Sequence, residues 1–198
     1  MKIQGGNKMI NTNSVLDAKG LACPMPIVKT KKAMNGLEAG EVLEVQATDK
    51  GSTADMKAWA ESTGHQYLGT VEEGTVLKHY LRKASGEEHE DKKHEKVISN
   101  EELLQKIEEN QYTIVLDVRE SAEYAFNHIP SAKSLPMGEL EERFSELDKE
   151  SEIFVICRTG SRSDLAAQKL TAAGFKQVVN VEPGMSQWNG PTQKSVNE

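Results

Sequence analysis

The chain has 198 residues, of which 37% are hydrophobic and 28% are charged, and its formal net charge is −7 at pH 7. This length allows one large domain or two small ones, and the composition excludes a chain that is disordered throughout. The sequence has no basic stripe of the kind that binds nucleic acid, no apolar run near the roughly 18 residues of a membrane span, and no secretory signal segment. We therefore expect a cytoplasmic protein that binds neither nucleic acid nor membrane.

A regular pattern begins after residues 1–13, whose polar composition predicts a disordered leader. The elements expected in the following 70 residues are a strand at 15–17, a helix from about 24 to 35, a strand at 42–47, a helix at 52–63, and strands at 65–71 and 75–82. Ser52 is expected to cap the second helix. The order βαβαββ predicts a two-layer α/β sandwich over residues 14–83, with both helices on one face of the sheet.

Cys23 lies just before the first of these helices, beside Pro24 and Pro26. A helix N-terminus favours the thiolate through its dipole and its unpaired N–H groups. Three lysines follow, at positions 29, 31 and 32, and they are either solvated or dock an acidic partner. The stretch 16–26, a Leu-Asp-x-x-Gly pattern followed by Cys-Pro-x-Pro, resembles the TusA family of sulfur carriers. This resemblance implies that Cys23 accepts a persulfide and passes its sulfur to another protein.

Residues 84–99 change in character, because the run 86–95 contains no apolar residue. Such a run predicts a charged linker between two domains. His89 and His94 lie within it, and with the neighbouring acids they form the one conceivable metal site in the sequence. Histidines in a charge run are more typical of solvated side chains, so we expect neither a metal nor a cofactor.

Residues 100–198 form the second predicted domain. Its expected elements are a helix from about 100 to 110, a strand at 114–118, a helical turn from 121, an extended piece near 132–135, an amphipathic helix carrying Leu140, Phe144 and Leu147, a strand at 153–156, a helix ending at 174, and a strand at 178–182. Alternating strands and helices predict a parallel sheet with helices on both faces. Catalytic groups in such folds follow the carboxyl ends of strands.

Cys157 stands at such a place, between an apolar strand and a helix. The loop that it opens can turn its N–H groups inward as an anion nest, and the helix dipole and two arginines favour a thiolate. The sequence therefore predicts a nucleophilic sulfur, with arginines attracting anionic donors and serines offering hydroxyl groups. The predicted substrate-binding residues are Arg158, Thr159, Gly160, Ser161, Arg162 and Ser163.

This loop, Cys-Arg-x-Gly-x-Arg, resembles the active loop of rhodanese-type sulfurtransferases, which cradles a cysteine persulfide. Two further segments match: 115–130, with an Asp-Val-Arg-Glu motif and a later His-Ile-Pro, and 181–188, with a Pro-Gly-Met motif and a tryptophan. Asn127 departs from the glycine that many relatives carry, which implies a local change of the turn. Asp117 and Arg119 are expected to brace the fold rather than to touch sulfur.

Loop length separates two chemistries. Four residues lie between Cys157 and Arg162, whereas related phosphatases and arsenate reductases use five to wrap a tetrahedral oxyanion. The shorter loop from Cys157 to Arg162 favours binding of the single outer sulfur atom of a persulfide over binding of a tetrahedral oxyanion. A disulfide between Cys23 and Cys157 is the structural alternative, and a cytosolic setting argues against it.

The whole chain resembles a TusA–rhodanese fusion. The resemblance implies a sulfurtransferase that loads Cys157 from thiosulfate or a low-molecular-weight persulfide and relays the sulfur to Cys23 or to an external thiol. The alternative is a persulfide carrier or sensing module that docks to partner proteins without turnover. The sequence leaves open the physiological donor and acceptor, the direction of transfer and the oligomeric state.

Overall fold

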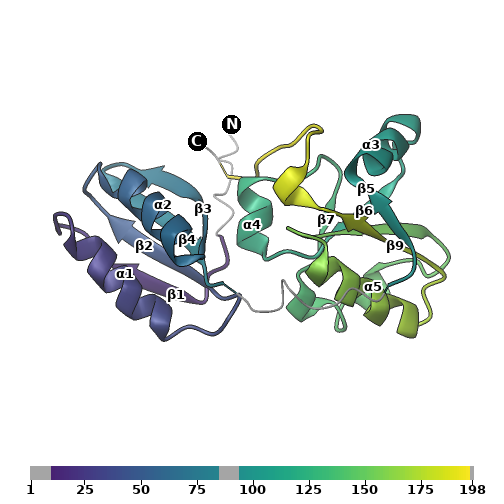
Figure 1. Ribbon diagram of the computed structural model, residues 1–198, viewed down its shortest axis with the longest axis horizontal. Coiled ribbons are helices and arrows are strands. Elements are labelled where there is room, and N and C mark those ends of the chain that lie inside the picture. Colours follow the sequence, from purple (N-terminus) through teal and green to yellow (C-terminus); the bar gives the residue numbers. More distant parts are fainter. Residues whose placement is uncertain (1–9, 85–93, 197–198) are drawn as a thin grey trace, which may run out of the picture. The chain divides into compact units, whose positions relative to one another are not determined.

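The computed structural model describes residues 10–84 and 94–196, which form two compact units (Figure 1). The first unit holds residues 10–84 and the second holds residues 94–194. Most of the predicted leader and of the predicted linker, at positions 1–9 and 85–93, lies outside the described residues.

The first unit is a mixed four-stranded sheet with two helices. Its elements are β1 (Ser14–Asp17), α1 (Met25–Asn35), β2 (Val42–Ala47), α2 (Ser52–Thr63), β3 (Gln66–Glu73) and β4 (Val76–Arg82). The strands lie in the order β1-β2-β4-β3, in which β1 is parallel to β2 and the other neighbours are antiparallel. The hairpin predicted at the end of this domain is the β3–β4 pair.

One face of this sheet carries the core. Leu43 and Val45 alternate along β2 and pack with Met34 of α1 and Met56 of α2 in one cluster. Because side chains two apart in a strand share a face, both helices cover the same side of the sheet (Figure 1). This confirms the predicted βαβαββ sandwich.

The second unit is a parallel five-stranded sheet in the order β5-β9-β8-β6-β7. Its strands are β5 (Val97–Ser99), β6 (Ile114–Asp117), β7 (Lys133–Ser134), β8 (Glu152–Ile156) and β9 (Gln177–Glu182). Its helices are α3 (Asn100–Glu109), α4 (Ser121–Phe126) and α5 (Ser161–Ala172), with the 3₁₀ turns η2 (Met137–Glu139), η3 (Phe144–Glu146) and η4 (Met185–Gln187).

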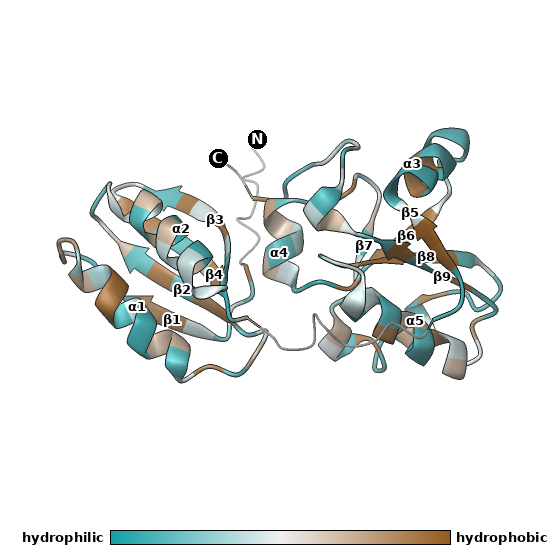
Figure 2. Ribbon diagram, viewed as in Figure 1, coloured by the Kyte–Doolittle hydropathy of each residue, from teal (hydrophilic) through white to brown (hydrophobic). Residues whose placement is uncertain are grey.

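Alternate residues of the central strand β8 face two separate cores. Ile153 and Val155 pack with the α5 residues Ala166, Ala167 and Leu170. The β8 residues between and after them, at positions 154 and 156, pack with α3 on the opposite face. Helices therefore cover both faces, as the sequence predicts, and the strands form the apolar centre of the unit (Figure 2).

The predicted amphipathic helix around Leu140 is wrong. The chain there makes the two 3₁₀ turns η2 and η3 instead of one α-helix. Leu140 and Phe144 still pack on the α5 side of the core, and the guanidinium of Arg143 bonds the carboxylates of Glu139 and Glu146. The spacing of apolar residues predicts which side chains face the core. Two short 3₁₀ turns place these side chains in the core as well as one α-helix would.

Two boundary predictions also differ from the structure. Ser52 is the first residue of α2 and does not cap it, because its hydroxyl donates to the carbonyl of Asp49 and contacts His79. The linker predicted to reach residue 99 ends earlier, since Val97–Ser99 is strand β5 and pairs in parallel with β9. An apolar Val-Ile pair after the charge run is enough to extend the sheet by one edge strand.

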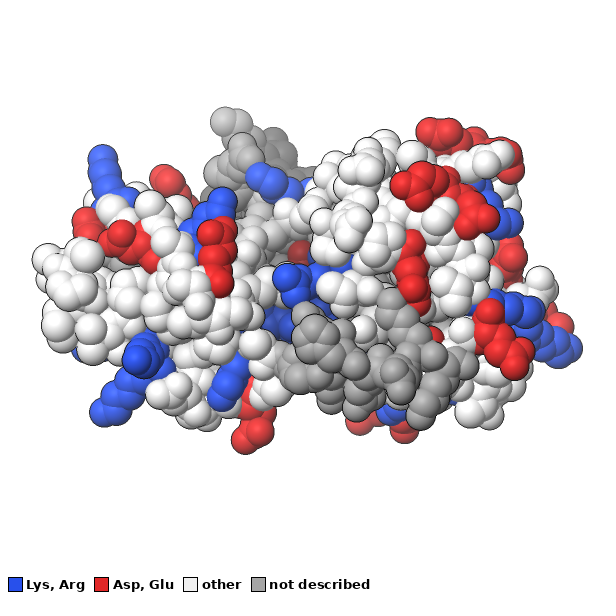
Figure 3. Space-filling view, in the orientation of Figure 1, with Lys and Arg blue, Asp and Glu red and all other residues white. Residues whose placement is uncertain are grey.

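The visible surface mixes both signs of charge (Figure 3). Residues 14–83 carry nine acids and nine bases, while residues 100–198 carry seventeen acids and ten bases. The cysteine loop therefore belongs to the acidic part of the chain. Within residues 10–84 and 94–196, no helix is long and apolar enough to cross a membrane.

Candidate functional site

Cys157 lies directly after the carboxyl end of β8, and only residues 158–160 separate it from α5. Its residue exposure is 1%. The chain turns at Gly160, whose φ of +93° is in the left-handed region that glycine adopts without strain. This turn closes the loop tightly around the sulfur.

The sulfur of Cys157 receives two hydrogen bonds. The Gly160 N–H donates over 3.1 Å and the Ser163 hydroxyl donates over 3.3 Å to Sγ. Both donors are fully or almost fully enclosed, because Gly160 is buried and Ser163 is 0% exposed. Donors fixed around a sulfur stabilise negative charge on it. The loop can therefore hold a thiolate, or the inner sulfur of a persulfide.

Arg162 differs from its expected role. Its guanidinium is buried and forms a two-point ion pair with Glu123 of α4, with N–O distances of 2.7 and 3.0 Å. Burial alone would lower the pKa of Arg162, but the Glu123 carboxylate outweighs it, and negative charge on Cys157 adds to the rise. Arg162 thus ties the loop to α4 instead of reaching toward a donor in solvent.

The other predicted loop residues remain nearer the surface. Arg158, Thr159 and Ser161 are each half-buried. They belong to the loop that follows Cys157, and each keeps part of its surface exposed to solvent. Of the predicted binding residues, the structure brings Gly160 and Ser163 to the sulfur. A role of the other three in binding a donor stays a prediction.

The segment 184–186, which follows β9, bonds the backbone of the cysteine loop. The N–H groups of Met185 and Ser186 donate to the carbonyls of Cys157 and Arg158, over 2.8 and 2.9 Å. Gly184 makes this approach possible, since a Cβ there would lie 2.5 Å from the Cys157 oxygen. Asn100 exchanges two hydrogen bonds with the Gly184 backbone. The sequence does not predict this contact, because a polar residue at a helix start is typical of a cap and Asn100 is 84 positions from Gly184.

Asp117 and Arg119 form the brace that the sequence predicts. Both are buried, and Arg119 donates to both Asp117 oxygens over 2.6 to 3.1 Å. Arg119 also donates to the carbonyl of Asn127 over 2.6 Å, which fixes the turn at this position. Asn127 itself is extended, with φ of −165°.

Cys23 contrasts with Cys157, since it is exposed at the start of α1. A hydrogen bond with the Asp55 carboxylate of α2 raises the pKa of Cys23, and burial and the charge of Asp49 act in the same direction. This direction runs against the expectation that the helix start stabilises a thiolate at Cys23. The α1 dipole favours the thiolate, but a carboxylate from the neighbouring helix opposes it. Both cysteines are free in the structure.

The first turn of α2, the helix that carries Asp55, contacts the buried side chain of His79. The Nε2 atom of His79 lies 2.8 Å from the Ser52 hydroxyl, and its Nδ1 atom lies 2.8 Å from that of Thr70. Burial lowers the pKa of His79 to about 4. A neutral imidazole thus links β4 to the first turn of α2.

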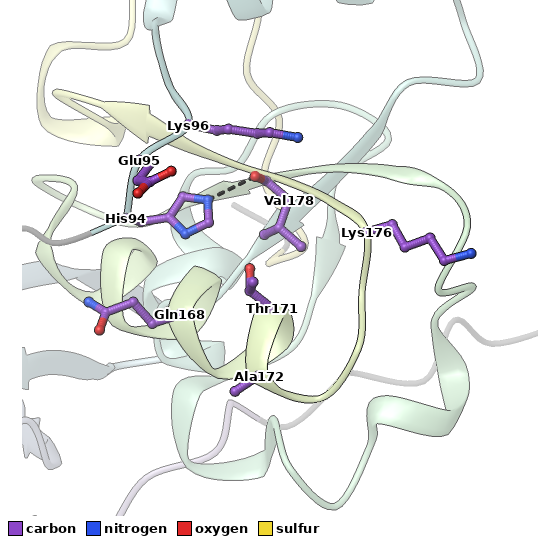
Figure 4. A pocket seen from close by; sticks show the side chains of 8 residues that line it. All are labelled: His94, Glu95, Lys96, Gln168, Thr171, Ala172, Lys176 and Val178. Atoms are coloured by element: carbon purple, nitrogen blue, oxygen red, sulfur yellow. Dashed lines mark hydrogen bonds between the residues drawn. The ribbon is translucent and has the colours of Figure 1, made fainter.

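His94 has a structural contact of its own. Its Nε2 donates to the carbonyl of Val178 over 2.8 Å, beside a hollow of about 420 Å³ (Figure 4). This hollow lies at the amino end of β9, whereas Cys157 follows the carboxyl end of the parallel strand β8. His89 lies outside the described residues, and in the part of the chain that the structure describes no cluster of His, Cys, Asp or Glu could hold a metal ion.

Comparison with known proteins agrees with both halves of the chain. Residues 14–83 match the family model "Sulfurtransferase TusA", and residues 99–191 match the "Rhodanese-like domain" model. "Putative sulfur carrier protein YrkF" of Bacillus subtilis (strain 168) is 53% identical over 93% of this chain and 100% of its own length. "Sulfur carrier protein TusA" of Allochromatium vinosum is 44% identical over 39% of this chain and all of its own length.

Two further relatives each cover half of the chain. "Putative sulfurtransferase YtwF" of Bacillus subtilis (strain 168) is 43% identical over 50% of this chain and 94% of its own length. A crystal structure of a rhodanese-like domain protein from Staphylococcus aureus covers 50% of this chain and 98% of its own, with 32% identity and a TM-score of 0.48. The chain belongs to the sulfur carrier and sulfurtransferase family in which a TusA domain is followed by a rhodanese-like domain.

Proposed function

We propose that the protein takes sulfane sulfur onto Cys157 from thiosulfate or a low-molecular-weight persulfide, and relays it to Cys23 or to an external thiol. The observation that carries this proposal is the pair of hydrogen bonds from Gly160 and Ser163 to the Cys157 sulfur. Fixed hydrogen-bond donors around a sulfur favour sulfur transfer, because the negative charge stays on sulfur in the reactant and in the product.

In the first step, the Cys157 thiolate attacks the outer sulfur of thiosulfate. A new S–S bond forms, the bond to the sulfonate sulfur breaks, and sulfite leaves with the electron pair. The product is a Cys157 persulfide anion, so the total charge of −3 is unchanged. Arg158, Thr159 and Ser161, which are half-buried around the loop, would receive the anionic donor. The ion pair of Arg162 with Glu123 would keep the loop closed meanwhile.

In the second step, an acceptor thiolate attacks the outer sulfur of the persulfide. The S–S bond breaks, Cys157 leaves as a thiolate, and the acceptor becomes the persulfide. A tether between the two cysteine-bearing domains raises the effective concentration of Cys23 as that acceptor. The raised pKa of Cys23 supports this order, because a protonated thiol attacks thiosulfate poorly on its own.

Mass spectrometry of both cysteines after thiosulfate treatment tests the proposal. Cys23→Ser should retain a Cys157 persulfide, whereas Cys157→Ser should leave Cys23 unloaded. Near-normal sulfur transfer by Cys157→Ser would overturn the assignment of Cys157. Efficient loading of Cys23 in a dilute mixture of the two variants would instead refute a relay within one chain.

The second candidate is a persulfide carrier or sensing module without turnover. The observation that favours it is the burial of Cys157, whose 1% exposure suits storage of a persulfide as well as catalysis. A steady-state assay separates the two functions: continuous release of thiocyanate from thiosulfate and cyanide indicates an enzyme, and a single stoichiometric loading indicates a carrier. The loop length predicts no phosphate release from an aryl phosphate in either case.

A further inference from the structure

Asn180 is an unusual residue for its place in the fold. It lies in β9, which is hydrogen-bonded to β5 on one side and to β8 on the other. Its exposure is 0%, and its neighbours Val179 and Val181 are apolar and buried. Asparagine is depleted in strands, and an aliphatic side chain would suit this interior position better. A buried amide here needs a reason other than the stability of the sheet.

The side-chain contacts of Asn180 point to the cysteine loop. Its Nδ2 donates to the carbonyl of Gly160 over 3.2 Å and to Oε1 of Glu182 over 3.1 Å. Because both neighbours of this nitrogen are oxygen acceptors, the reverse orientation of the amide is excluded. Its Oδ1 is buried and has no hydrogen-bond partner among the described residues. Asn180 thus leaves one polar atom unsatisfied while it holds Gly160.

Gly160 is the residue that aims an N–H at the Cys157 sulfur. Its carbonyl is held twice, by Asn180 and by the Asp164 N–H at 3.0 Å, which starts the hydrogen bonding of α5. With the carbonyl fixed, the φ of +93° directs the Gly160 N–H to the inside of the loop, 3.1 Å from Sγ. Asn180 therefore acts on the sulfur through one intervening residue.

The backbone around Asn180 is itself anchored. The Asn180 N–H donates to the Lys96 carbonyl over 2.9 Å, and the His94 N–H donates to Oδ1 of Asp164 over 2.9 Å. The segment 94–96 thus bonds both residues that hold the Gly160 carbonyl. Figure 4 shows the same segment fixed to β9 by the contact between His94 and Val178. Asn180 is consequently presented to the loop from a rigid frame.

We propose that Asn180 is a positioning residue for sulfur transfer, which holds Gly160 so that its N–H stabilises the anionic sulfur of Cys157. This inference rests on the proposed function for its consequence in sulfur transfer, but the geometry that it invokes concerns the thiolate alone. Asn180 touches neither donor nor sulfur. Its loss should therefore slow the chemical step and leave the affinity for thiosulfate unchanged.

Asn180→Leu in the full-length chain is the decisive variant, because leucine has a similar volume and no polar atom. It removes the donor to Gly160 together with the unsatisfied oxygen, so the fold should be as stable as before or more stable. Loss of one hydrogen bond onto the loop should lower kcat for sulfur release from thiosulfate by about five- to tenfold, with KM unchanged. In a Cys23→Ser background, the pH profile of Cys157 alkylation by iodoacetamide should shift to higher pH.

The matched control is Val179→Ala. It deletes buried methyl groups from the adjacent residue, which packs in the core on the α3 side, whereas the Asn180 side chain bonds Gly160 at the start of α5. It should lower stability without moving the alkylation profile. Asn180→Ala serves if the leucine variant does not fold. An unchanged alkylation profile and an unchanged kcat in the folded Asn180 variant would overturn the proposal. Absence of sulfur transfer by the unmodified chain, with a shifted alkylation profile in the Asn180 variant, would refute the proposed function and leave the positioning role intact.

Discussion

The ion pair between Arg162 and Glu123 allows a sharp test of how the cysteine loop is held. Its side chains are 5% and 0% exposed, and the two N–O distances are 2.7 and 3.0 Å. Removing one partner of a buried pair leaves an uncompensated charge and costs about 3–5 kcal/mol. Glu123→Gln keeps the shape and one oxygen acceptor, so we expect a loss near the lower end, about 3 kcal/mol.

The chain offers a control with nearly the same geometry. Arg143 and Glu146 also form a two-point pair, with distances of 2.6 and 3.0 Å, but their side chains are 32% and 38% exposed. Solvent screens such a pair, so Glu146→Gln should leave the stability without resolvable change. Both substitutions replace glutamate by glutamine, so the difference between their losses of stability measures the effect of burying the ion pair.

One tryptophan in each unit makes the measurement selective, since the chain has two, Trp59 and Trp188. In a Trp59→Phe background, the fluorescence of Trp188 follows unfolding of the second unit alone. A loss of about 3 kcal/mol in a unit of this size should lower its melting temperature by about 12–24 °C. Equal melting temperatures for Glu123→Gln and Glu146→Gln would refute the reasoning that the buried pair holds the loop.

Three further predictions concern other parts of the chain. Asp55→Asn should lower the pKa of Cys23 and shift its alkylation profile to lower pH, and an unchanged profile would show that Asp55 does not control this thiol. Because the pKa of His79 falls from 6.5 to about 4 on folding, the unfolded chain binds more protons between these values. The first unit should then keep its full stability above pH 6.5 and lose about 3 kcal/mol by pH 4, measured by urea denaturation. Gly184→Ala should destabilise the second unit and impair sulfur loading, because its Cβ would lie 2.5 Å from a backbone oxygen. Gly174→Ala is its control, because Gly174 has a φ of +93° against +84° for Gly184 and its Cβ would meet no atom closer than 3.7 Å. An equal effect of the two substitutions would disprove the clash.

Much of the fold follows from local pattern. Strand β2 has the predicted bounds, and the apolar run 153–156 is the inner part of β8. The alternation of strands and helices specifies a parallel sheet with the cysteine loop at a carboxyl end, because side-chain period and turn residues act over short distances. Around Leu140, an α-helix and two 3₁₀ turns are both compatible with the spacing of apolar residues, so the sequence pattern does not distinguish them.

The site is less predictable, because its decisive contacts join residues far apart in the chain. The motif identifies Arg162, but its partner Glu123 is 39 positions away, and the pairing converts an expected anion receptor into a brace. The position of Cys23 at a helix start predicts a lowered pKa, but Asp55 of the next helix acts in the opposite direction and raises it. Asn180 alone carried a local signal, as a polar residue among buried valines.

The two cysteines differ in the property that a directional relay requires. Cys157 has its donors in place before any sulfur arrives, so its anionic sulfur is stabilised by groups that need not reorganise. Cys23 is exposed beside a carboxylate that raises its pKa, which lowers the fraction of thiolate that can attack a donor. In the proposed relay this difference separates loading from delivery. Thiosulfate is consumed at the enclosed site, and the exposed cysteine receives sulfur only where a persulfide is held close to it, either by the tether or by a docked partner.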